Sequence, residues 1–310
     1  MKPLVAALIL AGMLSACSPP AESEDFGFVG QRILIPNDLP AFFDCLRARG
    51  QTQVAAHRGG PEAGYAENAI PTFEHTLTQA PAWLEVDVTR TRDGELVLMH
   101  DDEVDRSTTG EGRVSSLTLA ELQALHLRDQ DGKVLDAHPN TLAEVLDWAD
   151  GRTVLELDVK RSVSYEDVAE AVSEAGAMGR VVFITYSVDG ASRLHRVAPE
   201  AMIYTTINSA RDVDELERRG VPLSQIVAWT GNEEPDSALN TMLAARGVEV
   251  NFGTLGDWDR RFEREGAQYA AFAETGVQLI STDTPAAAVA DLDAHDGVDG
   301  YGALQCLEAQ

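Results

Sequence analysis

Positive charge is scarce in this sequence. Its 24 Lys and Arg stand against 51 Asp and Glu, which gives a formal net charge of −27. Nucleic acids and anionic membrane surfaces repel such a chain, so the composition excludes nucleic acid as a partner. The negative charge does not oppose the binding of a cation. Acids that bind one are hard to tell, in the sequence, from the many acids that only keep the surface soluble.

Long hydrophobic runs are also missing. The apolar stretch at 4–14 is shorter than the ~20 residues that a membrane-spanning helix needs, which argues against an uncleaved anchor. With Lys2 before it and small residues after it, residues 1–17 have the layout of an export signal. Leu14-Ser15-Ala16-Cys17 resembles the bacterial lipobox, which implies a lipoprotein signal peptide and lipidation of Cys17. An ordinary cleaved signal peptide is the alternative.

The residues after Cys17 bear on location. Ser18, rather than an acidic residue, follows the cysteine, which in envelope lipoproteins favours the outer membrane. We therefore expect an exported protein, lipid-anchored in the cell envelope and facing the periplasm. Residues 18–45 are predicted to form a tether and N-terminal extension, the first part of it flexible.

Cysteine is rare, with three in the whole chain. Lipidation of Cys17 leaves Cys45 and Cys306, and an even pair in an oxidising compartment suggests a disulfide. If the fold closes into a barrel, its first and last strands are neighbours, so the segments that carry these two residues can meet. The alternative is two unpaired buried thiols.

No linker divides the remaining chain, which at 44% hydrophobic can bury a large core. Alternating strand and helix patterns predict an α/β fold, a parallel TIM-type (β/α)8 barrel over 46–292, followed by a C-terminal tail at 293–310. Nine candidate strands compete for eight places, and we demote 226–229 because it is short and ends in a turn-rich stretch. A helical region at 102–150 is inserted after the third strand, with two capping boxes that begin at Thr118 and Thr141.

Chemically active side chains gather at the ends of four predicted strands, and such ends converge on one face of a barrel. These residues are His57 and Arg58, Glu85 and Asp87, His100, and Asp158 with Lys160. Carboxylates hold a hard divalent cation through oxygen, and the cation and basic groups offset charge that develops on a phosphoryl group. Two histidines can accept and donate the protons. The set therefore predicts phosphodiester cleavage.

Several motifs occur in the order typical of one enzyme family. They are His57-Arg58-Gly59, Glu67-Asn68, Glu85-Val86-Asp87-Val88, Asp93-Gly94, His100-Asp101, Arg106-Ser107-Thr108-Thr109-Gly110, 140–146 and 276–285. With them the chain resembles the glycerophosphodiester phosphodiesterase family from about residue 54 to 285. The resemblance implies a TIM barrel, an acid/base pair of His57 and His100, and phosphate contacts from Arg58 and Lys160. It also implies that Glu85 and Asp87 bind Ca²⁺ or Mg²⁺.

Three positions depart from the family pattern. Asp158 stands where a glutamate is usual, yet it can still bind a metal, with Glu156 one step deeper on the same face. Ala69 replaces the threonine that usually follows Glu67-Asn68. Residues 251–254 replace a tryptophan-threonine pair, which bears on the substrate more than on the chemistry.

Three functions remain open from the sequence. The first is hydrolysis of glycerophosphodiesters to an alcohol and glycerol 3-phosphate, which makes the partner a small molecule. The second is phospholipase D-like action on lysophospholipids or sphingolipids, which Asp158 and the lipid anchor favour. The third is a non-catalytic binding lipoprotein on a barrel scaffold.

The other five histidines are interpreted as surface or helix residues: His75, His126, His138, His195 and His295.

Overall fold

The computed structural model describes residues 36, 38–296 and 306. The predicted signal peptide at 1–17 with Cys17, most of the tether and most of the C-terminal tail lie outside these residues. The predicted barrel boundary at residue 46 falls inside helix α1 (Leu39–Arg49). Among the described helices, none combines the length and the apolar character needed to cross a membrane.

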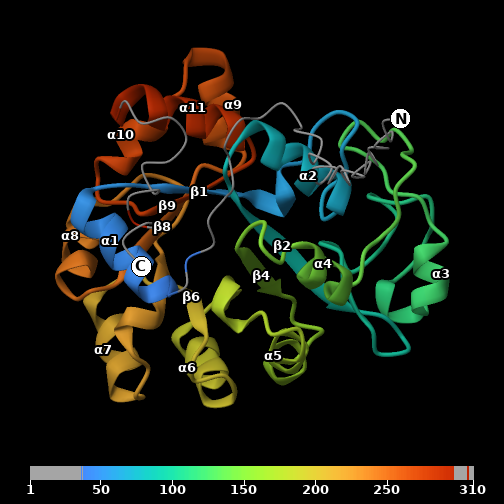
Figure 1. The fold of residues 1–310 in the computed structure, drawn as a ribbon, viewed down its shortest axis with the longest axis horizontal. Coiled ribbons are helices and arrows are strands. Elements are labelled where there is room, and N and C mark those ends of the chain that lie inside the picture. The colour runs from blue at the N-terminus through green and yellow to red at the C-terminus, as the bar shows by residue number, and fades with distance from the viewer. Residues whose placement is uncertain (1–35, 37, 297–305, 307–310) are drawn as a thin grey trace, which may run out of the picture. The chain divides into compact units, whose positions relative to one another are not determined.

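Eight parallel strands of the described chain close into a barrel, as predicted (Figure 1). Strand β1 pairs with both β2 and β9, so the sheet has no free edge at the point of closure. The barrel strands are β1 (Gln53–Ala56), β2 (Trp83–Arg90), β4 (Leu155–Val159), β5 (Val181–Ile184), β6 (Met202–Thr206), β7 (Ile226–Trp229), β8 (Glu249–Gly253) and β9 (Leu279–Thr282).

The ninth strand, β3 (Leu96–Leu98), lies outside the barrel. It turns back at Gly94 and pairs antiparallel with the outer half of β2, with Val88 opposite Leu98. The demotion of Ile226–Trp229 was therefore wrong, because that segment is barrel strand β7 and pairs with both β6 and β8. A length of four residues is no argument against a barrel strand, since β1, β5 and β9 are also four residues long.

Helices surround the strands, and α5 to α8 follow one another around the outside (Figure 1). The segment before β9 forms two helices, because Gly266 ends the first with φ 102°. The helices after the barrel strands are α2 (Ile70–Gln79), α5 (Tyr165–Glu174), α6 (Val188–Val197), α7 (Ala210–Arg218), α8 (Ser237–Ala245), α9 (Asp257–Glu265), α10 (Tyr269–Ala273) and α11 (Pro285–Asp296). Short 3₁₀ turns are η2 (Val114–Ser116), η3 (Met178–Arg180) and η4 (Leu223–Gln225).

The inserted region contains two short helices, α3 (Leu119–Gln123) and α4 (Leu142–Trp148). Both begin with the expected capping box, in which a threonine side chain and a glutamate three residues later satisfy free amides of the first turn. Residues of the insertion pack a small separate core against Val97 and Met99 beside β3. The insertion thus covers β3 and the segment that leads to His100.

Helix α1 closes the N-terminal end of the barrel. Its Phe42 and Phe43 pack against the Trp83 ring at the start of β2, with centroids 5.8 and 5.2 Å away. Cys45 on α1 and the buried Cys306 form a disulfide, with their Cα atoms 5.6 Å apart. The chemistry-bearing residues lie at the other end of the strands, so this end supports the fold.

Replacing Cys45 and Cys306 together by serine is expected to lower the free energy of unfolding by about 2–4 kcal/mol. The cross-link joins positions 261 residues apart, so its loss releases a very large loop in the unfolded chain. Urea unfolding of the parent and the double variant measures the difference. Added reductant should destabilise the parent alone. Equal stability of the parent and the double variant, both measured without reductant, would contradict the prediction.

Candidate active site

A tight turn places His57 at the mouth of the barrel. Strand β1 ends at Ala56, and the chain enters the 3₁₀ turn η1 (His57–Gly59), in which Arg58 and Gly59 have φ 51° and 81°. Left-handed backbone is rare for arginine and marks a constrained position. Any Cβ on Gly59 would lie 2.2 Å from the Phe73 ring. The turn therefore needs glycine at position 59.

Hydrogen bonds join this turn to the acids of β2. The Arg58 amide donates to Glu85 Oε2 at 2.8 Å. Asn68, also left-handed at φ 57°, donates its amide to the Arg58 carbonyl at 3.0 Å. Its side chain donates to Asp87 Oδ2 at 2.6 Å and accepts from the Asp87 amide at 2.9 Å. Asn68 therefore links the turn to Asp87, a role that the sequence analysis did not assign.

The structure brings together Glu85, Asp87 and Asp158. One carboxylate oxygen from each lies within 4.8 Å of the other two, and all three residues are buried. Side-chain alternation places Glu85 and Asp87 on one face of β2, and the register of β4 sets Asp158 directly opposite Asp87. Burial and the neighbouring Asp87 and Asp158 charges raise the pKa of Glu85 well above its ordinary value.

These residues fit a hard divalent cation. The ligand atoms are all carboxylate oxygens, and the self-repulsion that raises the Glu85 pKa is what a cation between them would relieve. Lys160 supplies part of the compensation, since its Nζ lies 2.6 Å from Asp87 Oδ1 and 2.6 Å from Asp158 Oδ2. Burial opposes ionisation of Asp87, yet Lys160 and Asn68 together lower its pKa.

Each candidate catalytic histidine is paired with a carboxylate. His57 Nδ1 donates to Asp283 Oδ1 at 2.7 Å, and His100 Nδ1 donates to Asp101 Oδ1 at 2.7 Å. A carboxylate can only accept here, so Nδ1 of each ring carries a proton and Nε2 is left for proton transfer. Asp283 is held in turn by the Gly256 amide at 2.9 Å.

Arginines beside the turn form a network with Glu67. Arg58 Nη1 lies 3.1 Å from Glu67 Oε2, and Arg106 donates two hydrogen bonds to the same carboxylate at 2.9 and 2.6 Å. Arg106 also donates to Asp101 at 2.6 Å. Burial opposes ionisation of Glu67, but the Arg106 hydrogen bond and the Arg58 charge lower its pKa. Arg106, whose role the sequence left open, therefore steadies the partner of His100.

Cavities flank His57 on two sides. One, of about 220 Å³, reaches the acidic cluster and is walled by aromatic residues Tyr186, Tyr204 and Trp229. The Tyr186 hydroxyl donates to Asp158 Oδ1. A second depression, of about 580 Å³, is lined by three arginines and four acids: Arg58, Arg106, Arg128, Glu67, Asp129, Asp131 and Asp283. A substrate at His57 would thus have an aromatic, acidic side and a side of mixed charge that carries three arginines.

Comparison with known proteins identifies the family of this chain. The sequence profile of the glycerophosphoryl diester phosphodiesterase family matches residues 57–287. The chain belongs to this family. The match begins at His57 and extends past Asp283, so it contains both histidine–carboxylate pairs and the three clustered acids.

Individual family members agree with that placement. The chain is 30% identical over 160 residues to a glycerophosphodiester phosphodiesterase of Caldanaerobacter subterraneus, covering 49% of this chain and 65% of that protein. It is 31% identical over 172 residues to a probable glycerophosphodiester phosphodiesterase 1 of Mycobacterium tuberculosis, covering 48% of this chain and 62% of the other. The chain thus spans slightly less than two thirds of the length of these relatives.

Two solved structures share the barrel. A glycerophosphoryl diester phosphodiesterase from Parabacteroides distasonis superposes with a TM-score of 0.73 at 31% identity, over 82% of this chain and 92% of that one. An Oleispira antarctica phosphodiesterase, solved with the product sn-glycerol-3-phosphate, superposes with a TM-score of 0.62 at 21% identity, over 80% and 99%. The second likeness concerns the fold alone.

Two features of this glycerophosphoryl diester phosphodiesterase family member were not predicted from the sequence. Asp283 was part of a recognised motif but received no role, although an acid directly after the last barrel strand was a usable signal. Trp229 lies on β7, the demoted strand, and its ring occupies the space above Gly253, where a Cβ would approach it to 2.2 Å. An aromatic wall therefore stands near the position where the family's tryptophan is missing.

Glu156 lies apart from the clustered acids. It is directly opposite Glu85 in the sheet and fully buried, and neither of its carboxylate oxygens has a hydrogen-bond partner in the described part of the chain. Burial raises the pKa of Glu156 to about 8. The residue is therefore mostly protonated at neutral pH and is a poor cation ligand, unlike its neighbour Asp158.

Glu156→Gln is expected to flatten the pH dependence of stability between pH 4.5 and about 8. In the parent, the folded-state pKa lies above the unfolded value, so the proton stabilises the folded protein fully below pH 4.5. That stabilisation is lost as the pH rises through about 8, by up to ~1.4 kcal/mol per pH unit. Urea unfolding at a series of pH values measures it. Identical pH profiles for parent and variant would refute the assignment.

Proposed function

We propose that this protein is a metal-dependent phosphodiesterase that hydrolyses glycerophosphodiesters to an alcohol and glycerol 3-phosphate. The observation that carries the proposal is the pair of histidine–carboxylate couples beside three clustered carboxylates at the barrel mouth. Proton transfer at two positions and charge compensation at phosphorus are the two requirements of this reaction, and the site has residues for both. Membership of the family supports the same reaction.

His57 and His100 are proposed to divide the proton transfers. One Nε2 takes a proton from the attacking water or glycerol hydroxyl as the new bond to phosphorus forms. The other ring enters the reaction as the imidazolium and gives its Nε2 proton to the leaving oxygen as the old bond breaks. If the glycerol hydroxyl attacks, water then opens the cyclic phosphodiester by the same two proton transfers in reverse, which yields glycerol 3-phosphate. Asp283 and Asp101 keep each ring in the tautomer that makes this possible and stabilise the imidazolium when it forms. Arg58 and Lys160 are proposed to contact the phosphate.

Glu85, Asp87 and Asp158 are proposed to hold Ca²⁺ or Mg²⁺, which when bound offsets the charge on the phosphoryl oxygens. Asn68 and the Arg58 amide orient two of these carboxylates before any cation arrives. Such preorganisation reduces the reorganisation needed at the moment of reaction.

The cavity beside His57 supports a small substrate. About 220 Å³ accommodates a glycerol unit or a compact headgroup, and its acidic and aromatic walls suit a cationic alcohol such as choline. A lysophospholipid carries an acyl chain besides its headgroup and would need a larger cavity than this one. This favours glycerophosphodiesters over lysophospholipids, the phospholipase D-like alternative.

The assay that tests the proposal compares two substrates. Protein lacking residues 1–17 is incubated with glycerophosphocholine and, separately, with lysophosphatidylcholine, each with and without a chelator. Release of glycerol 3-phosphate that requires a divalent cation is the expected result. Activity that survives complete metal removal would refute the metal-dependent mechanism. Cleavage of the lysolipid alone would establish the alternative.

We also propose that the protein is exported and anchored to the envelope through Cys17. The layout of residues 1–17 supports export, and the Cys45–Cys306 disulfide is compatible with an oxidising compartment. Mass spectrometry of the mature N-terminus tests the anchor. A diacylglyceryl group on Cys17 is expected, and a free N-terminus at another residue would contradict it.

A further inference from the structure

A hairpin in the inserted region presents a second group of metal-ligating side chains. Residues 125–138, here called the 125–138 hairpin, join α3 to α4. The Leu127 amide donates to the Ala137 carbonyl at 2.8 Å, and the Leu135 amide donates to the Leu127 carbonyl at 2.9 Å. The chain reverses between Asp129 and Gly132, where the Gly132 amide donates to the Asp129 carbonyl at 2.9 Å. Its two arms therefore run antiparallel.

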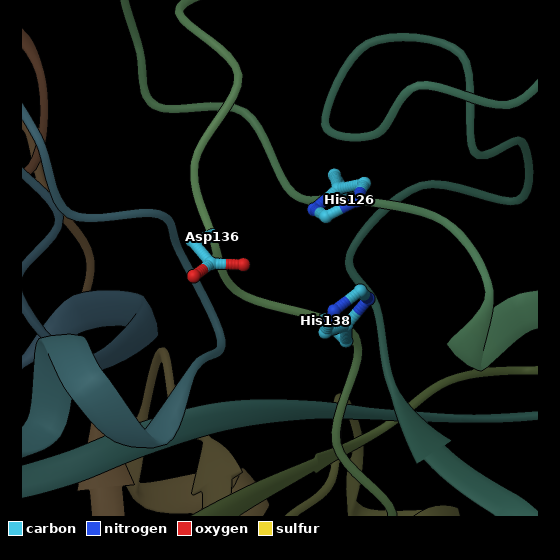
Figure 2. A group of neighbouring side chains, drawn as sticks. All are labelled: His126, Asp136 and His138. Carbon is cyan, nitrogen blue, oxygen red and sulfur yellow. The ribbon is translucent and has the colours of Figure 1, made fainter.

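The hairpin has one apolar and one polar face. Leu127, Leu135 and Ala137 pack against Ala66 and Ala69, which flank the Glu67-Asn68 pair of the active site. Because side chains alternate along an extended arm, the residues between and beside them are directed to the other face. These are His126 on one arm, and Asp136 and His138 on the other. Figure 2 shows the three side chains on the same side of the hairpin, with one oxygen of the Asp136 carboxylate directed toward the two rings.

The spacing of the three side chains suits a shared ion. One nitrogen of each imidazole and one Asp136 carboxylate oxygen all lie within 4.8 Å of one another, and the ring centroids are 4.5 Å apart. Tetrahedral ligands at ~2.0–2.1 Å from zinc are roughly 3.3 Å apart. Asp136 is exposed, so its side chain is free to bring a carboxylate oxygen closer to the two rings.

Backbone hydrogen bonds prepare both rings for coordination. His126 Nδ1 donates to the Leu135 carbonyl at 3.1 Å, and His138 Nδ1 donates to the Leu125 carbonyl at 2.7 Å. A carbonyl oxygen can only accept, so Nδ1 carries the proton and Nε2 of each neutral ring keeps its lone pair. An imidazole that donates its other N–H to a backbone carbonyl is the usual arrangement of a metal-ligating histidine. Each hydrogen bond also crosses between the two arms of the hairpin.

We propose that His126, Asp136 and His138 form a second metal site, for a transition-metal ion of the Zn²⁺ class. Two imidazoles and one carboxylate favour such an ion over Mg²⁺ or Ca²⁺, which prefer the all-oxygen set of Glu85, Asp87 and Asp158. Water completes the coordination. The ion joins the two arms of a hairpin that packs against the Glu67-Asn68 segment. The tip of this hairpin, including Arg128 and Asp129, lines the depression beside His57. The site is structural and does not depend on the proposed reaction.

Zinc binding to the purified protein tests this site. Calorimetric titration with Zn²⁺ is made in excess Mg²⁺, so that the oxygen ligands of the barrel mouth are engaged by the harder ion. The parent is expected to bind one Zn²⁺ that Mg²⁺ does not displace. His126→Ala and His138→Ala should each weaken this binding at least 10-fold, and Glu85→Gln should leave it unchanged. His295→Ala is the matched control, since it removes an exposed histidine outside the hairpin.

A second readout separates binding from misfolding. Zn²⁺ should raise the unfolding temperature of the parent and of His295→Ala but not of His126→Ala or His138→Ala. In the presence of chelator all four proteins should unfold at similar temperatures. Absence of Mg²⁺-resistant Zn²⁺ binding in the parent would overturn the proposal. Equal Zn²⁺ affinity of the parent and the two hairpin variants would overturn it as well.

Discussion

His57→Ala is expected to lower kcat/KM for glycerophosphocholine by roughly 10²–10⁴-fold, the usual contribution of one positioned acid or base. The turn that places the His57 ring is formed by Arg58 and Gly59, which both have left-handed backbone. Asp283 fixes the Nδ1 atom of the ring. No other histidine of the described chain shares that carboxylate, so none can substitute. Initial rates at saturating and limiting substrate give kcat and KM separately. The loss should fall mainly on kcat, because proton transfer matters most in the transition state.

His75→Ala is the matched control for that variant. The His75 side chain is 22% exposed and paired with Glu62, while the His57 side chain is 25% exposed and paired with Asp283. The two truncations therefore remove the same ring from similar surroundings, but His75 lies outside both cavities that flank His57. An active His57→Ala protein, or an equal loss in both variants, would refute the proposed role of His57.

Glu85→Gln is expected to reduce activity by roughly 10²–10³-fold, since a bound cation contributes several kcal/mol of charge stabilisation. The same change should leave the metal-free protein as stable as the parent or more stable. Glutamine keeps the shape and an oxygen that accepts the Arg58 amide, but it removes a charge that burial and two neighbouring carboxylates disfavour. Opposite effects on activity and on stability would distinguish a metal ligand from a structural acid.

Thermal unfolding with and without divalent cation measures the second effect. Ca²⁺ or Mg²⁺ should raise the unfolding temperature of the parent through preferential binding to the folded state, and chelator should reverse it. Glu85→Gln should lose this response. Glu156→Gln should keep it, because that residue faces Glu85 across the sheet but lies outside the cluster. If Glu85→Gln responds to the cation as the parent does, Glu85 is not a ligand.

The strand periodicity was enough to predict the acidic cluster. Alternation placed Glu85 and Asp87 on one face, and the same rule applied to residues 153–160 placed Asp158 on the matching face. Parallel register then set Asp87 opposite Asp158. These residues could be predicted because each depends on its own strand and on a regular sheet geometry.

His100 was predicted to lie at the barrel mouth, but the predicted direction of its strand was wrong. The strand before His100 was predicted to be a parallel barrel strand, but β3 is antiparallel and folds back along β2. Apolar periodicity is the same in both directions, so it cannot report the direction of pairing. The Asp93-Gly94 turn and the lack of a helix before β3 were the local signs of a hairpin. Treating β3 as a barrel strand also forced the mistaken demotion of Ile226–Trp229.

By itself, then, the sequence determined the barrel, the capped helices of the insertion, and the identity of the acids and histidines at the mouth. All of these follow from local periodicity, capping and recognisable motifs. Tertiary structure alone decided which groups became partners: Asp283 with His57, Asn68 with Asp87, and His126 with Asp136 and His138. The physical reason is that a hydrogen bond depends on distance in space, and residues 57 and 283 are neighbours only because the barrel closes between β1 and β9.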